Sequence, residues 1–161
     1  MRLWAPQNCT PRVSAPSTTR LVPVMKLAAG LARNTAARAI SSVSGREIDF
    51  AAGPYGTFKA AIIHYTQGLA YQLAGKGIRA NTVSPGNTYF DGGVWQNIEQ
   101  GNPELFSQAM ALNPTGRMAK PDEIARGVAF LASPAASFVT GANLVIDGAL
   151  TRGAGVGGDA A

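Results

Sequence analysis

Tyr55 and Lys59 are the two residues of this sequence whose types and spacing most directly indicate chemistry. If a helix begins at Pro54-Tyr55 and continues past Lys59, the four-residue step places the phenol and the ammonium on one face of that helix. A tyrosine hydroxyl ordinarily titrates near ~10, so it transfers protons at neutral pH when a neighbouring cation stabilises the phenolate. We therefore predict that Lys59 activates Tyr55 as a general acid or base.

Three serines, Ser41, Ser42 and Ser44, lie shortly before this pair. A hydroxyl delivered from the end of a preceding strand supplies a hydrogen bond to a substrate oxygen that gains charge in the transition state. The residue types alone leave the three serines as alternatives for this role.

Around these residues the sequence resembles the short-chain dehydrogenase/reductase family, in which a serine and a Tyr-x-x-x-Lys follow one another at the separation of Ser42, Tyr55 and Lys59. Three further blocks resemble that family in the same order: residues 78–86 (IRANTVSPG), residues 116–125 (GRMAKPDEIA) with 130–133 (FLAS), and residues 140–148 (TGANLVIDG). The four blocks extend over roughly residues 39–152 and resemble the C-terminal half of a complete member.

The resemblance implies an NAD- or NADP-dependent enzyme that interconverts an alcohol and a carbonyl on a small molecule, without fixing which of the two cofactors is used. Tyr55 would exchange a proton with the substrate oxygen, Lys59 would favour the phenolate and hold the cofactor ribose, and Ser42 would orient the substrate. Hydride transfer requires the nicotinamide, because no side chain supplies a hydride. The cofactor-binding residues implied by the resemblance are Tyr55, Lys59, Pro85, Gly86 and Thr88.

The sequence also departs from that family. A complete member begins with a strand, a Gly-rich turn and a helix that holds the dinucleotide pyrophosphate, and these features are missing here, as is the family asparagine on the helix before the serine. The alternative is a truncated, non-catalytic remnant that acts as an interaction subunit. The resemblance implies a homo-oligomer assembled through the helix at 55–74. Its apolar stripe is predicted to comprise Ile62, Tyr65, Leu69 and Leu73.

The expected fold class is α/β, a Rossmann-type parallel sheet with flanking helices that lacks the N-terminal strands. The predicted elements are a helix at 21–38, a short strand at 37–41, a loop at 46–54, a helix at 55–74, a strand at 78–83, a helix at 121–132 and a strand at 143–146. Open α/β sheets bind ligands beyond the carboxyl ends of their strands. Ser42, Tyr55 and the turn at 84–86 are therefore expected on one rim of the sheet.

Residues 87–113 are the least regular part of the body. We expect one or two helices over the cleft, one of them starting at Pro103-Glu104, where a proline and an acid favour a helix N-terminus. The resemblance implies a substrate lid here. Trp95 and Phe106 have two possible roles, as parts of this lid or as simple core side chains.

The net charge of +5 comes from the N-terminal segment. Residues 1–46 hold seven Lys and Arg and no acid, whereas residues 47–161 hold seven Lys and Arg against nine Asp and Glu. Without aromatic platforms or a recognisable nucleic-acid-binding fold, these cations do not predict nucleic-acid binding. We expect a disordered or irregular basic segment at 1–20, a partial Rossmann-like domain at 21–152 and a flexible Gly/Ala tail at 153–161.

Several other patterns carry no chemistry. Residues 153–158 fit G-x-G-x-x-G, but that motif binds a nucleotide where it follows a strand and opens a helix. His64 has no acid or cysteine at ligand spacing, so we expect no metal. The single cysteine, Cys9, fits a reducing, cytoplasmic setting, although the Arg- and Ser/Thr-rich start also resembles an organellar transit peptide. No apolar run reaches the ~18 residues of a membrane span.

Overall fold

The computed structural model describes residues 36–48 and 53–151, in which strands and helices alternate along the chain. The elements are β1 (Ala36–Ile40), η1 (Val43–Gly45), α2 (Pro54–Ala74), β2 (Arg79–Pro85), α3 (Val94–Gly101), α4 (Pro103–Ala111), α5 (Pro121–Ala132), η2 (Pro134–Ala136) and β3 (Asn143–Ile146). Within this part of the chain no helix is both long and apolar enough to cross a membrane.

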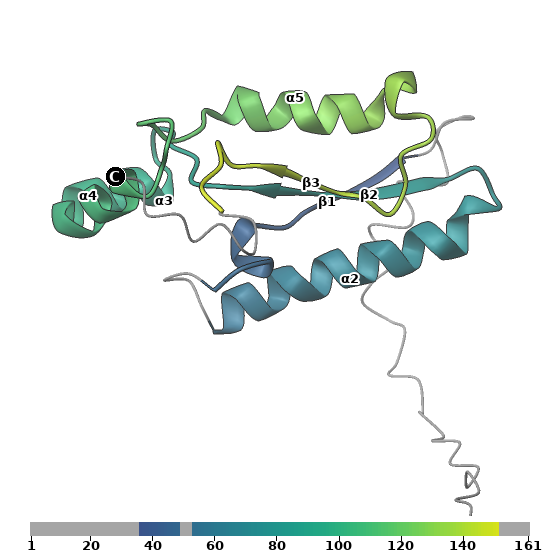
Figure 1. Cartoon of the computed structure of the whole chain (residues 1–161), viewed down its shortest axis with the longest axis horizontal. Coiled ribbons are helices and arrows are strands. Elements are labelled where there is room, and N and C mark those ends of the chain that lie inside the picture. The colour runs from purple at the N-terminus through teal and green to yellow at the C-terminus, as the bar shows by residue number, and fades with distance from the viewer. Residues whose placement is uncertain (1–35, 49–52, 152–161) are drawn as a thin grey trace, which may run out of the picture. The chain divides into compact units, whose positions relative to one another are not determined.

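The three described strands form a parallel sheet in the order β1-β2-β3. Helix α2 covers one face of this sheet and α5 covers the other (Figure 1). The middle strand, β2, is buried along nearly its whole length, as expected for a parallel strand with helices on both faces. The predicted α/β fold class is confirmed.

Strand β1 corrects one prediction. The sequence predicted both a helix ending near 38 and a short strand at 37–41; the strand is confirmed and the helix end is wrong, because residues 36–40 pair in parallel register with β2, from Ala36 opposite Arg79 to Ile40 opposite Val83. The segment is rich in alanine, which favours helices locally, and cross-strand pairing overrides that preference. The rest of the predicted helix, the basic segment at 1–20 and the tail at 153–161 lie outside the described residues.

Helix α2 matches the predicted helix at 55–74 and begins one residue earlier, at Pro54. Proline suits this first position because its missing N–H has no helical partner there. The predicted apolar stripe is only partly right. Leu69 and Leu73 are half-buried, but Tyr65 is 54% exposed, and the buried positions of the helix include Thr66 and Ala70. Small side chains at those positions let the helix lie close to the sheet.

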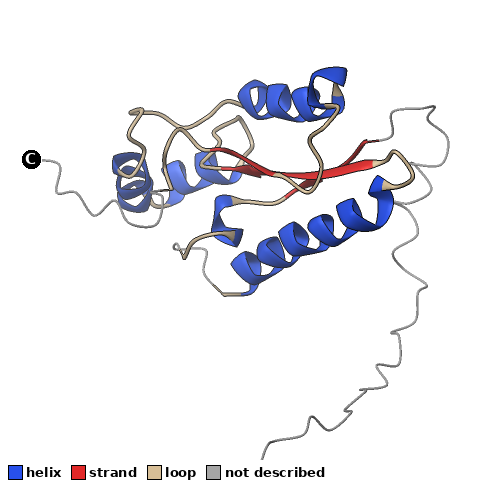
Figure 2. Ribbon diagram, turned by 45° about the vertical axis from the view of Figure 1, so that its right-hand side comes forward, coloured by secondary structure: helices blue, strands red, loops and turns tan. Residues whose placement is uncertain are grey.

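The other predicted strands and helices are confirmed, with α5 and β3 ending where the sequence placed them and β2 extending to Pro85, while residues 49–52 of the predicted loop at 46–54 lie outside the described residues. The segment at 87–113 folds as the two short helices α3 and α4, and α4 begins at Pro103 as expected. Both lie beyond the end of the sheet at which β2 terminates (Figure 2).

The face of the sheet under α5 holds a core of Val83, Leu131 and Ala136. Arg79 reaches from the start of β2 to the end of α5, where its Nη1 donates to the carbonyl of Leu131 at 2.8 Å. The same guanidinium donates to the carbonyls of Val139 at 3.3 Å and Ser133 at 3.4 Å. It thereby satisfies the Leu131 carbonyl at the end of α5, whereas the Ser133 and Val139 carbonyls also accept from the Ala136 N–H and Asn81 Nδ2.

We predict that Arg79→Met lowers the free energy of unfolding by about 1–3 kcal/mol, because it removes three hydrogen bonds and leaves the Leu131 carbonyl without the donor that Arg79 supplies. Urea denaturation measures this effect. Lys76→Met, an exposed position shortly before β2, is the control for loss of a nearby charge and should change stability much less. Equal effects of the two substitutions would contradict the capping role.

Candidate active site

Ser42 lies immediately after β1, where it caps the short helix η1. Its Oγ accepts a hydrogen bond from the Ser44 backbone N–H and donates to Ser44 Oγ, both at 3.2 Å. Ser41, in contrast, is only 3% exposed, and its Oγ donates to the Lys59 carbonyl at 2.7 Å. The Ser41 hydroxyl therefore links the end of β1 to α2, and its proton is used in this structural hydrogen bond.

Gly45 allows this serine segment to contact α2 directly. A Cβ at residue 45 would lie 2.6 Å from the Lys59 carbonyl carbon and 2.7 Å from the Ala60 nitrogen. Contacts that short do not occur, so any larger residue would force the segment away from the helix. Reasoning from the sequence assigned no role to Gly45. The only feature that could have drawn attention to it is its position close after the three serines.

Tyr55 and Lys59 lie in the first turns of α2 and face the same side, as predicted. Lys59 Nζ is 5.4 Å from the centroid of the Tyr55 ring and donates to the Ile40 carbonyl at 3.2 Å. The second contact holds the ammonium at the carboxyl end of β1, beside the serine segment. Tyr55 is 51% exposed, so its hydroxyl group belongs to an open cleft.

Two cavities meet at these residues. One, of about 500 Å³, extends towards α3 and is bounded there by Val94, Trp95 and Ile98. The other, of about 470 Å³, extends towards Lys59 and Pro85. Four residues line both cavities: Ser42, Tyr55, Gly86 and Thr88. Of the three candidate serines, Ser42 alone borders both.

The turn after β2 forms the floor shared by the two cavities. A Cβ at Gly86 would lie 2.7 Å from Asp147 Cβ, so glycine permits the end of β2 to approach the end of β3. Thr88 Oγ1 donates to the Gly86 carbonyl at 3.1 Å. Pro85, Gly86 and Thr88 thus line one cavity together, and their role as cofactor contacts stays a prediction.

The segment over the cleft, the predicted lid, contributes to both the core and the cavity wall. Trp95 is 7% exposed and packs with Ala109 and Met118, yet it also lines the cavity next to Tyr55. Phe106 packs edge-to-face on Tyr89, with ring centroids 6.1 Å apart. Trp95 is therefore both a core side chain and part of the cavity wall, Phe106 packs against the same core cluster, and the role of this segment as a substrate lid stays a prediction.

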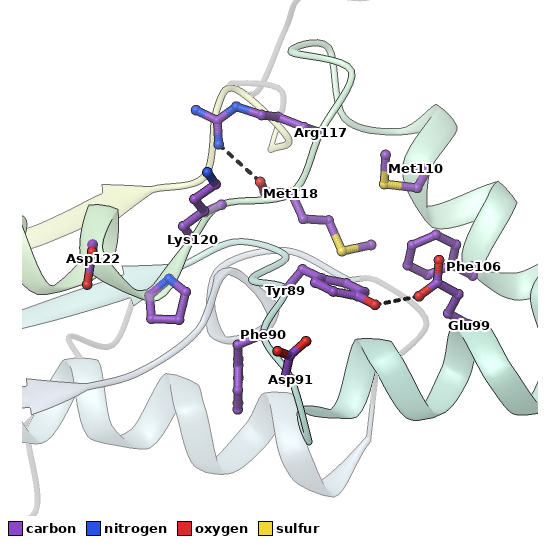
Figure 3. Close-up of a pocket in the computed structure, with 12 residues that line it drawn as sticks. Tyr89, Phe90, Asp91, Glu99, Phe106, Met110, Arg117, Met118, Lys120 and Asp122 are labelled. Atoms are coloured by element: carbon purple, nitrogen blue, oxygen red, sulfur yellow. Dashed lines mark hydrogen bonds between the residues drawn. The ribbon is translucent and has the colours of Figure 1, made fainter.

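Tyr89 connects this lid to the turn after β2. Its hydroxyl donates to Glu99 Oε2 on α3 at 2.5 Å (Figure 3), and this hydrogen bond is the main cause of a raised Tyr89 pKa. Its backbone N–H donates to the Ala119 carbonyl at 2.9 Å. These contacts hold α3 so that Trp95 lies over the cavity.

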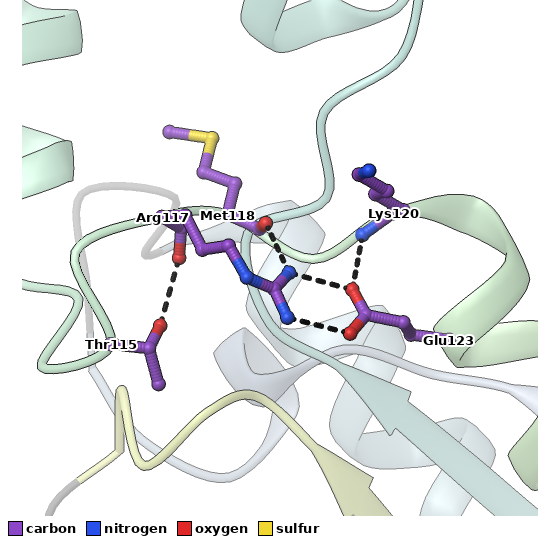
Figure 4. A network of polar contacts seen from close by, with 5 residues as sticks. All are labelled: Thr115, Arg117, Met118, Lys120 and Glu123. Atoms are coloured by element: carbon purple, nitrogen blue, oxygen red, sulfur yellow. Dashed lines mark hydrogen bonds and ion pairs between the residues drawn. The ribbon is translucent and has the colours of Figure 1, made fainter.

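Arg117 and Glu123 form a bidentate ion pair beside the lid, with both N–O distances 2.7 Å (Figure 4). The Lys120 backbone N–H also donates to Glu123, at 2.8 Å. The Arg117 hydrogen bonds, followed by the Lys120 N–H, lower the pKa of the Glu123 carboxyl from 4.5 to about 2. The pair fixes the segment 117–120, which supports the lid through Met118.

We predict that Glu123→Gln destabilises the protein at neutral pH and that this loss fades in acid. A carboxyl whose pKa falls on folding stabilises the folded state above its unfolded pKa, near 4.5, and loses that contribution as the pH drops through about 2. Urea denaturation at several pH values should show the gap between the two proteins closing in this window. Glu104→Gln, also in the first turn of a helix, is the control for the helix dipole. A pH-independent gap would contradict the pairing.

His64 is exposed on α2. Among residues 36–48 and 53–151, no group of three or more His, Cys, Asp or Glu side chains is placed to hold a metal ion. The prediction of no metal remains a prediction for the chain as a whole.

The parallel sheet, the Ser-Tyr-Lys cleft and the glycine turn define this chain as a member of the short-chain dehydrogenase/reductase family. The family described as Enoyl-(Acyl carrier protein) reductase matches residues 8–151. Isoepoxydon dehydrogenase of Penicillium expansum is 41% identical over 115 residues, 70% of this chain and 44% of that protein. Galactitol 2-dehydrogenase (L-tagatose-forming) of Cereibacter sphaeroides is 42% identical over 100 residues, 62% of this chain and 38% of that protein.

Solved structures agree. A short-chain dehydrogenase/reductase family oxidoreductase of Burkholderia thailandensis is 36% identical, with a TM-score of 0.63 over 73% of this chain and 45% of that one. A short-chain type dehydrogenase/reductase of Mycobacterium ulcerans is 30% identical, with a TM-score of 0.64 over 71% of this chain and 41% of that one. The chain thus spans less than half the length of the relatives named here.

Proposed function

We propose that this protein is an NAD(P)-dependent oxidoreductase that interconverts an alcohol and a carbonyl on a small molecule. The observation that carries this proposal is the pair of cavities that share Ser42 and Tyr55. Hydride transfer brings two reactants into contact at one carbon, while a proton moves at the attached oxygen. Two adjoining chambers with a phenol and a serine between them suit that reaction.

The residues have separable roles. Tyr55 donates a proton to the carbonyl oxygen during reduction and removes it from the alcohol during oxidation. Lys59, 5.4 Å from the ring, stabilises the phenolate that forms when the proton leaves. Ser42 Oγ donates a hydrogen bond to the same substrate oxygen, where charge develops. Gly45 and the Ser41 contact keep these groups on adjoining segments.

The cavity beside Lys59 suits the nicotinamide cofactor, which would supply or accept the hydride. Its donors are an ammonium and hydroxyl groups, which match the ribose hydroxyls and carboxamide of NAD or NADP. The residues we assign to this contact are Tyr55, Lys59, Pro85, Gly86 and Thr88. The dehydrogenase and reductase names of the relatives support this enzyme over a non-catalytic interaction subunit.

Calorimetry with NAD and NADP tests the cofactor half of this proposal. We expect one of them to bind, and Lys59→Met to weaken that binding at least tenfold because the ribose contact is lost. Lys76→Met, a change of the same type beyond the end of α2, should leave it unchanged. Absence of binding by both cofactors would contradict a cofactor-dependent activity of this chain.

We also propose that the protein forms a homo-oligomer through α2. Phe58 and Tyr65 are exposed by 73% and 54% and lie two turns apart on one side of this helix, and neighbouring apolar side chains at a surface favour association. Analytical ultracentrifugation of Phe58→Glu together with Tyr65→Glu should show dissociation relative to the unmodified chain. A cytoplasmic location is proposed from the single cysteine, which fits a reducing compartment.

A further inference from the structure

We infer that the substrate is an uncharged, compact alcohol or ketone with an apolar body, the size of a single ring or a short chain. This inference rests on the proposed function and narrows its substrate class. The cavity between Tyr55 and α3 carries it, because the described side chains around that cavity supply only hydroxyl, amide and apolar groups.

None of the described residues that line this cavity is ionisable apart from Tyr55. Its polar wall consists of Ser42, Ser44, Tyr55, Asn87 and Thr88, and its apolar wall consists of Val43, Val94, Trp95 and Ile98. The nearby cations face other cavities: Lys59 lines the one assigned to the cofactor, and Arg117 and Lys120 line a third behind the lid.

A carboxylate or phosphate bound against this apolar wall would lose its hydration without gaining a cation. Burying an unpaired charge costs several kcal/mol, far more than burying a hydroxyl that keeps a hydrogen bond. A neutral group does not incur this cost of burying an unpaired charge. Neutral hydroxyl or carbonyl groups can instead hydrogen-bond with the hydroxyl groups of the polar wall, Ser42, Tyr55 and Thr88.

The size of the cavity limits the substrate further. A volume of about 500 Å³ lies at the lower end of the range for small-molecule sites. The buried indole of Trp95 closes the side towards α4, where it packs on Ala109 and Met118. A flat apolar ring or a short aliphatic chain fits within this volume against such a wall.

Ligand binding tests this inference without turnover. The sequence contains two tryptophans, Trp4 and Trp95, so in the full chain carrying Trp4→Phe the fluorescence reports on the cavity wall alone. We would titrate this protein with cyclohexanone, cyclohexanol, cyclohexanecarboxylate and cyclohexyl phosphate. We expect the two neutral rings to bind at least tenfold more tightly than the two anions.

Equal or tighter binding of the anions would overturn the inference, and so would a Trp95 signal that responds to none of the four probes. Tight binding of the neutral rings without turnover by any nicotinamide cofactor would leave the inference standing and contradict the proposed function instead. The two failures are therefore distinguishable.

A charge placed in the wall gives the complementary test. Val94 is 64% exposed, so Val94→Lys should fold, and it adds a cation at the apolar side of the cavity. Cyclohexanecarboxylate should bind this variant at least tenfold more tightly than the matched neutral variant Val94→Gln. Identical carboxylate affinities for the two variants would show that ligands do not contact this wall.

Discussion

Tyr55→Phe is expected to lower turnover by about 10²–10⁴-fold, the range typical for loss of a positioned proton donor. Phenylalanine keeps the ring and its contact with the Lys59 ammonium, so the cleft retains its shape while the transferable proton disappears. Because Tyr55 is 51% exposed, the free energy of unfolding should change little. The measurement is the rate of nicotinamide absorbance change with a neutral cyclic alcohol or ketone, alongside a urea denaturation curve.

Tyr71→Phe is the matched control, since Tyr71 lies on the same helix and is 89% exposed. It should retain full turnover. Ser42→Ala should show an intermediate loss, because Tyr55 still supplies the proton when the orienting hydroxyl is gone. Turnover of Tyr55→Phe within a few fold of the parent protein would assign the proton to another group and remove the central step of the proposed mechanism.

Gly45→Ala is expected to lower turnover by about 10²-fold, although residue 45 touches neither reactant. The added Cβ would meet the backbone of α2 at Lys59 and Ala60, at 2.6 and 2.7 Å. These are main-chain atoms that no side-chain rotation relieves, so the serine segment must move away from the helix. A displacement of about 1 Å between reacting groups suffices for a loss of this size.

Gly68→Ala is the matched control, because a Cβ at this position on α2 meets no atom within 4 Å. Alanine favours a helix over glycine by roughly 0.5–1 kcal/mol, so this variant should be slightly more stable and fully active. If Gly45→Ala also kept full turnover, the close approach would not position Ser42. The measurement compares kcat and thermal stability for both variants.

The two cavities at Ser42 and Tyr55 became distinguishable only from the fold. Tyr-x-x-x-Lys spacing predicts one helical face, but it does not show that Ser42 borders both cavities while Ser41 is hydrogen-bonded to the Lys59 carbonyl. Neither could spacing show that Trp95 serves as core and cavity wall together. Each of these facts depends on contacts between residues far apart in the chain.

The sequence alone was sufficient to predict the α/β class, the bounds of α5 and β3, and the helix that carries Tyr55 and Lys59. These features depend on short-range periodicity, a proline at the helix start and the fixed pitch of a helix. The tertiary structure was needed to decide that residues 36–38 belong to the short strand and not to the helix predicted before it, to show that Tyr65 is exposed and to give Gly45 a role. In each case a partner segment distant in sequence supplied the hydrogen bonds or the steric limit, and no local pattern encodes that partner.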